Sequence, residues 1–294
     1  MLTQTNETLW TAVEHQEKHY LRYCLNSHDL EASALVSTQD HSSLFNPAIR
    51  SQAATSFITL HGMEENWDVF ESTLERLRPT PALRLDMPWS GQKGYDWGLN
   101  DTPLAQRLLC ALKQLPHQPR IVIAHSFGTS ALLSYIDKYG TSAFDALILI
   151  SPFYLFNEQE FDWEALQYYG GFYQQFLEST VTVRMKKTLD PDIQSRMAEH
   201  IKNKIGPFGC ILSLYQLIRS RSFDLTRIQI PTLVITGEDD FYSLPDHCQR
   251  IADTLPQGEC SIIKDSGHFS MIDDPQTVAN HIQKFITKST GISL

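Results

Sequence analysis

The sequence predicts an α/β fold, in which a mostly parallel, twisted sheet carries helices on both faces. Short apolar runs alternate along the chain with segments whose apolar residues recur at helical spacing, a pattern typical of strands joined by crossover helices. Such crossovers are right-handed and bury the sheet between two layers of helices. Polar or glycine-containing loops follow several of the runs, at the carboxyl ends of strands, where ligands bind in these sheets.

Residues 1–53 carry the weakest pattern in the chain. Their apolar residues lie roughly on one helical face, so we expect a helix beginning near Asn6, although residues 20–25 would equally suit a first strand. We interpret residues 1–53 as an N-terminal extension that packs on the core and carries no chemistry.

Residues 54–151 show the alternation most clearly, since each short apolar run ends at a turn or a polar loop. Strands are expected for the runs, and helices wherever apolar residues recur every three or four positions. In chain order these are a strand at 56–60, a helix at 67–77, a strand at 82–85, a helix at 103–115, a strand from Arg120 to the turn at Ser126, a helix after that turn and a strand at 146–150.

The alternation breaks in residues 152–225, where helical stretches replace strands and aromatic residues are frequent. These rings either line an apolar pocket or form the core of the segment and its contact with the sheet. The aromatic residues are Phe153, Tyr154, Phe156, Phe161, Trp163, Tyr168, Tyr169, Phe172, Tyr173 and Phe176.

Residues 226–294 return to the alternating pattern. Strands are expected at 231–236 and 259–263, and a helix at 275–287 closes the fold. Residues 54–151 and 226–294 are therefore expected to form one core, which residues 152–225 interrupt.

The strand that begins at Arg120 ends abruptly at Ser126. Small residues flank this serine, with Ala124 before it and Gly128 after it, as a close approach of strand and helix requires. An ordinary serine cap of the following helix is the alternative interpretation. The stretch resembles the nucleophile elbow of the α/β-hydrolase superfamily, Gly-x-Ser-x-Gly, with Ala124 in place of the first glycine.

Two further motifs extend this resemblance. A Gly-x-x-Asp motif begins at Gly237, after a strand, and the register of the superfamily motif selects Asp240 over Asp239 as the catalytic acid. After the last strand, a glycine frees the backbone so that His268 can turn back over the sheet. The order Ser126, Asp240, His268 is the order of nucleophile, acid and base in α/β-hydrolases.

The resemblance also implies an oxyanion hole and a helical cap. The two donors would be the backbone N–H groups of Phe127, just after the nucleophile, and Met63, in the loop after the first core strand. Residues 152–225 stand where the superfamily commonly inserts a cap over the active site. Neither remaining candidate histidine is given a catalytic role: His125 points away from the serine side chain, and His61 is expected to be a structural hydrogen-bonding residue.

These motifs predict a serine hydrolase that cleaves an ester or a thioester with a hydrophobic acyl or aromatic group through an acyl-enzyme. A serine hydroxyl needs a base within hydrogen-bond reach, and that base needs an acid to orient it. A carbon–carbon bond hydrolase or cyclase acting on a diketone or polyketide-like intermediate is the alternative on the same fold. A ligand-binding protein that keeps the fold without catalysis is a third hypothesis.

Composition excludes several other classes. A formal net charge of −10 and a pI near 5.5 argue against a nucleic-acid partner, which needs clustered lysine and arginine. The five cysteines are odd in number and form no Cys-x-x-Cys pair, which favours reduced thiols in the cytoplasm. No apolar run is long enough to span a membrane, and no secretory leader is expected. No cluster has metal-ligand spacing, so neither a metal nor a cofactor is expected.

The expected partner is a small-molecule substrate. A basic cluster of Arg184, Lys186 and Lys187 could attract an acyl-CoA or a substrate bound to a carrier protein, although a solvated helix face is the more usual explanation of such a run. The sequence does not predict the oligomeric state.

Overall fold

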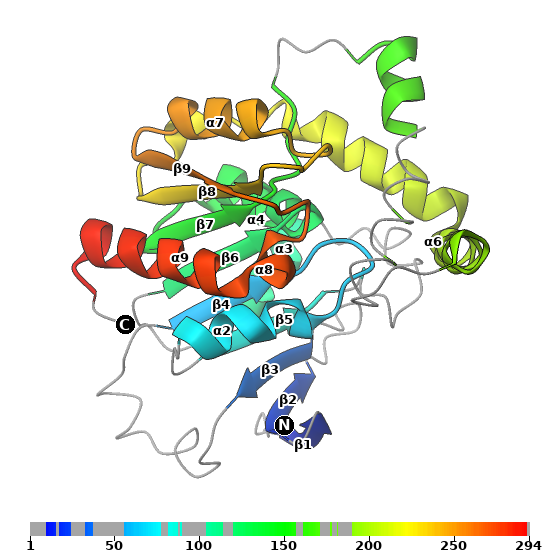
Figure 1. Ribbon diagram of the computed structural model, residues 1–294. Helices are drawn as coiled ribbons and strands as arrows, with labels where there is room; N and C mark the ends of the chain where they lie inside the picture. Colours follow the sequence, from blue (N-terminus) through cyan, green and yellow to red (C-terminus); the bar gives the residue numbers. More distant parts are fainter. Residues whose placement is uncertain are drawn as a thin grey trace, which may run out of the picture.

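A computed structural model describes residues 10–15, 18–24, 33–37, 56–77, 82–87, 89, 104–113, 120–156, 161–170, 177, 181 and 190–292. The strands in these ranges form one nine-stranded sheet in the order β1-β2-β3-β5-β4-β6-β7-β8-β9 (Figure 1). The basic cluster of Arg184, Lys186 and Lys187 and the rings of Phe172, Tyr173 and Phe176 lie outside the described residues.

Six neighbouring strands of this sheet are parallel, which confirms the expected fold class. All the core strands expected from the sequence are present, and every residue of the central strands β6 and β7 is buried, as in parallel sheets covered on both faces. The six strands are β4 (Ser56–Leu60), β5 (Ala82–Asp86), β6 (Arg120–His125), β7 (Ala146–Ile150), β8 (Thr232–Gly237) and β9 (Gly258–Ile263).

The helix expected near Asn6 is wrong. The chain instead forms β1 (Trp10–His15), β2 (Lys18–Cys24) and β3 (Ser33–Ser37), which continue the sheet from β5 as antiparallel strands. The alternative of a strand at residues 20–25 was closer, since β2 covers most of that range. A short amphipathic run fits both periodicities, and pairing with β5, far along the chain, supplies the context that the local pattern lacks.

Helices cover both faces of the parallel sheet, and each face has its own apolar core. They are η2 (Trp67–Phe70), α2 (Glu71–Leu77), α3 (Leu104–Lys113), α4 (Phe127–Tyr139), α7 (Pro245–Thr254), α8 (Ser270–Asp273) and α9 (Pro275–Thr290). One core joins α2 and α9 to Ile121 and Ile123 of β6, and the other joins α3, α4 and α7 to Val122 and Ala124. Figure 1 shows α2 and α9 in front of the sheet and α3 and α4 behind it. Alternating side chains of one strand thus supply both cores.

The described part of residues 152–225 contains helices and no strand, as the sequence predicts. Residues 163–170 form a helix, and α6 spans Pro191–Ser220 with a break at Gly206, whose φ of 66° lies outside the helical range. The 3-10 helix η4 (Leu225–Arg227) follows. In Figure 1, α6 (yellow) extends beyond the edge of the sheet. Within the described ranges, no helix combines the length and the apolar character needed to cross a bilayer.

Candidate active site

Ser126 occupies a strained turn between β6 and α4. Its φ of 47° lies in the left-handed region, which costs a residue with a side chain about 1–3 kcal/mol. A Cβ atom at Gly128 would collide with the carbonyl oxygen of Leu60, so the helix approaches the sheet as closely as the motif predicts. The turn holds the serine above the carboxyl end of β6.

The structure brings Ser126, His268 and Asp240 together from three separate loops. The hydroxyl of Ser126 lies 2.9 Å from Nε2 of His268, and Nδ1 of the same ring lies 3.0 and 3.1 Å from the carboxylate oxygens of Asp240. All three residues are buried, whereas Asp239 is exposed. Asp240, rather than Asp239, is therefore the carboxylate that contacts His268.

The carboxylate of Asp240 is held by backbone donors as well as by the imidazole. Burial would raise the pKa of Asp240, but the charge and hydrogen bond of His268, the N–H of Ser243 and the hydroxyl of Ser151 bring this pKa below its usual value. The N–H groups of Tyr242 and Ser243 each lie 2.9 Å from Oδ1. A carboxylate with several donors stays ionised and keeps a fixed orientation.

A second buried histidine–carboxylate pair lies beside the first. Nδ1 of His125 is 2.6 Å from Oε1 of Glu65, and neither side chain is accessible to solvent beyond 1%. Nε2 of His125 donates to the carbonyl oxygen of His268 at 2.9 Å, and the rings of the two histidines are 4.9 Å apart. The other oxygen of Glu65 accepts from the N–H of Gly62 at 2.7 Å. The sequence pattern gave neither Glu65 nor His125 a role.

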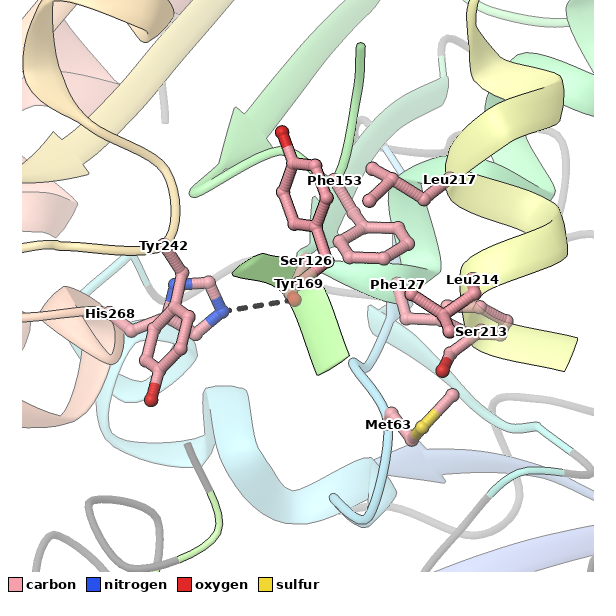
Figure 2. Close-up of a pocket in the computed structure, with 10 residues that line it drawn as sticks. All are labelled: Met63, Ser126, Phe127, Phe153, Tyr169, Ser213, Leu214, Leu217, Tyr242 and His268. Atoms are coloured by element: carbon pink, nitrogen blue, oxygen red, sulfur yellow. Dashed lines mark hydrogen bonds between the residues drawn. The ribbon is translucent and has the colours of Figure 1, made fainter. Parts of the chain in front are cut away.

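The loop after β4 is fixed by His61, as expected. Nε2 of His61 accepts from the N–H of Met87 at 2.9 Å, and its carbonyl accepts from the indole of Trp89 at 3.1 Å. Met63, two residues later, and Phe127, the first residue of α4, both line the pocket that contains Ser126. The two residues whose N–H groups are expected to stabilise the oxyanion thus lie on the same side of the serine (Figure 2).

A predominantly apolar cavity of about 100 Å³ opens over Ser126 and His268. Figure 2 shows Tyr242 next to His268, and Met63, Phe153 and Leu217 on the opposite side of Ser126. Of the aromatic residues expected to line a pocket, Phe153 and Tyr169 do so, while Tyr154 and Phe156 pack in the core. The lining residues are Met63, Ser126, Phe127, Phe153, Tyr169, Ser213, Leu214, Leu217, Tyr242 and His268.

Both interpretations of the aromatic segment are therefore correct for some of its rings. The sequence did not single out Leu214, Leu217 or Tyr242, because only the packing of α6 and of the loop after β8 against the elbow brings them to the pocket. Among the described residues, no group of three or more His, Cys, Asp and Glu side chains could hold a metal ion.

Residues 55–275 match the family model described as the alpha/beta hydrolase fold. The chain is 21% identical over 266 residues to the AB hydrolase superfamily protein YisY of Bacillus subtilis (strain 168), which covers 85% of this chain and 97% of that protein.

Solved structures resemble the chain over most of its length. A thermophilic esterase from Thermogutta terrifontis, with malate bound, superposes with a TM-score of 0.61 at 17% identity, over 92% of this chain and 98% of the esterase. A bromoperoxidase from Bacillus anthracis gives a TM-score of 0.63 at 16% identity, over 91% and 99% of the two chains. These neighbours differ in their reactions, so they establish the fold alone.

Proposed function

Because the chain belongs to the α/β-hydrolase fold family, we propose that it is a serine hydrolase acting on an ester or thioester with a hydrophobic acyl or aromatic group. The observation that carries this proposal is the hydrogen-bonded series of Ser126, His268 and Asp240 beneath a mainly apolar cavity. Hydrolysis proceeds through an acyl-enzyme on Ser126.

In the first step, the oxygen of Ser126 attacks the carbonyl carbon while Nε2 of His268 takes the hydroxyl proton. The imidazolium that forms is stabilised by Asp240, which contacts Nδ1. His268 then gives the proton to the leaving alcohol or thiol. A water molecule, activated by the same histidine, attacks the acyl-enzyme in the second half of the reaction and releases the acid.

The negative charge on the tetrahedral intermediate requires donors on the far side of the carbonyl. We assign this role to the backbone N–H groups of Phe127 and Met63, because both residues line the cavity beside Ser126. The N-terminus of α4 also favours negative charge at this point. Losing one such donor costs about 3 kcal/mol in the transition state.

The acyl group occupies the side of the cavity formed by Phe127, Phe153, Leu214 and Leu217, and the leaving group lies towards Tyr242. Because Phe153, Leu214 and Leu217 belong to residues 152–225, we propose that this segment is a cap that selects the substrate. Acyl-CoA and carrier-bound substrates remain candidates among the thioesters. The cytoplasm is the proposed compartment, and it suits the free thiols of Cys210, Cys248 and Cys260.

The test is intact-mass spectrometry after exposure to an alkyl fluorophosphonate, comparing the wild type with Ser126→Ala. We expect one adduct on the wild type and none on the variant, because only an activated serine displaces fluoride from phosphorus. An adduct that persists in Ser126→Ala, or none on the wild type, would contradict the proposal.

A panel of nitrophenyl esters, acyl thioesters and a vinylogous diketone then separates the bond classes. Preferred turnover of the diketone would indicate carbon–carbon cleavage. Saturable binding without turnover or labelling would indicate the ligand-binding protein.

A further inference from the structure

Glu65 and His125 form a buried contact that the reaction steps above do not use. Each side chain is at most 1% exposed, and a buried charged pair is costly unless its partners are well arranged. The pair touches all three loops of the site: Glu65 accepts from Gly62, next to Met63, and His125 precedes Ser126 and donates to the backbone of His268.

We propose that Glu65 and His125 are positioning residues, which hold the oxyanion loop, the nucleophile elbow and the catalytic histidine loop in register as a permanent ion pair. The inference rests on the proposed serine hydrolase function and extends it to two residues outside the triad. Glu65 and His125 act through their neighbours, since neither lines the cavity.

The partners of His125 determine its charge. A neutral imidazole has one N–H, and its other nitrogen is an acceptor. Both nitrogens of His125 face acceptors, the carboxylate of Glu65 at 2.6 Å and the carbonyl oxygen of His268 at 2.9 Å. The contact with Glu65 is a charge contact without hydrogen-bond geometry. A neutral ring that keeps its proton on Nε2 for His268 would turn the Nδ1 lone pair towards the carboxylate, so the imidazolium is the favoured form, and losing the proton breaks the link to Glu65.

The surrounding charges agree with this assignment. Burial would lower the pKa of His125, but the carboxylate of Glu65, the carbonyl of His268 and the more distant Asp240 raise it above the usual value. Burial would raise the pKa of Glu65, but His125, His61 and the N–H of Gly62 bring it below the usual value. The side chains of His268 and Phe269 pack against the His125 ring.

The absence of a side chain at Gly62 is an independent observation that supports the ion pair. A Cβ atom there would lie 2.6 Å from Oε1 of Glu65 and 3.0 Å from Nδ1 of His125. The glycine therefore leaves room for the ion pair directly beneath the loop that carries Met63.

The test compares Glu65→Ala, which removes the link, with Glu65→Gln, which can restore it in neutral form. In Glu65→Gln the amide oxygen can accept from Gly62 and the amide N–H₂ can donate to a neutral His125, which keeps its other N–H for His268. The exposed Glu238 gives the matched control, Glu238→Gln.

The readout is the rate of phosphonylation by an alkyl fluorophosphonate at saturation, measured as a function of pH. We expect Glu65→Ala to slow it by about 10- to 100-fold, the effect of misplacing reacting groups by about 1 Å, and Glu65→Gln to recover most of the rate. The wild type should lose rate at alkaline pH as His125 deprotonates, while Glu65→Gln should lack that alkaline limb. The control should match the wild type.

Folded Glu65→Ala with the wild-type rate would overturn the inference, and so would an alkaline limb that persists unchanged in Glu65→Gln. If Glu65→Ala does not fold, the pH profile of Glu65→Gln decides. Nitrogen NMR of histidine-labelled protein, assigned with His125→Gln, gives a readout independent of activity. A neutral His125 in the wild type near about pH 7, where an unperturbed histidine is already mostly neutral, would overturn the inference even if Ser126 is the nucleophile. A cationic His125 would support it even if Ser126 does not react.

Discussion

Two histidine–carboxylate pairs lie side by side in this protein, and they differ in the group that the second ring nitrogen faces. In the pair of His268 and Asp240, that group is the hydroxyl of Ser126, which can donate or accept a hydrogen bond. In the pair of His125 and Glu65, it is a backbone carbonyl, which can only accept. In the proposed mechanism the first ring exchanges its proton during the reaction, whereas in the proposed ion pair the second ring keeps its proton. The third group therefore determines whether such a pair acts as a base or as a fixed link.

The largest expected effect separates the two histidines. His268→Ala should lower turnover of an activated ester by about 10⁶-fold, the cost of losing the base of a triad, whereas His125→Gln should lower it by about 10- to 100-fold. Steady-state kinetics measure both, and His200→Gln, at an exposed position on α6, is the control. Equal losses in the two variants would remove the distinction.

The two neighbouring aspartates give the next effect. Asp240→Asn should lower kcat by about 10⁴-fold, because the amide favours the wrong tautomer of His268. Asp239→Asn should stay within about twofold of the wild type, since that side chain is exposed. The contrast is measured as the kcat values of the two variants on one ester. A large loss of kcat in Asp239→Asn would show that the assignment of Asp240 as the acid is wrong.

A smaller effect is expected from changing the wall of the cavity that is proposed to hold the acyl group. Leu217→Trp should reduce kcat/KM for a long-chain ester relative to the acetate by about tenfold, because the larger ring fills the acyl side of the cavity. Ile218→Trp changes the adjacent, exposed residue of α6 and should leave the ratio unchanged. The same ratio in both variants would place the acyl group elsewhere.

The smallest effect concerns stability. The pKa of His125 is raised in the folded protein, so its contribution is fully present below the unfolded value of about 6.5 and is lost as pH rises through the folded pKa. Denaturant unfolding across the alkaline range should show the free energy of unfolding fall in the wild type and not in Glu65→Gln. Each unit of pKa difference corresponds to about 1.4 kcal/mol, and parallel curves would show that the ion pair contributes nothing.

Much of the candidate active site could be predicted from local sequence because each of its residues follows a strand. An apolar run stops at Ser126, another leads to Asp240 and a third precedes His268, and parallel strands bring their carboxyl ends to one edge. Glu65 and His125 also follow or end such strands, so their proximity could have been expected. No motif connects them, however, and their pairing depends on side-chain directions that the sequence does not give.

The sequence by itself determined the parallel core and the tight turn at Ser126, because burial on two faces and tight turns leave patterns within a few residues, whereas Asp240 was selected by the resemblance to the superfamily motif. Only the tertiary structure decided that Trp10–His15 is a strand, since β1 reaches the core through pairing with β2, then β3 and finally β5. It also decided which residues of α6 reach the cavity and that Glu65 faces His125. These contacts join parts of the chain far apart in sequence, and their energies depend on packing that no local pattern contains.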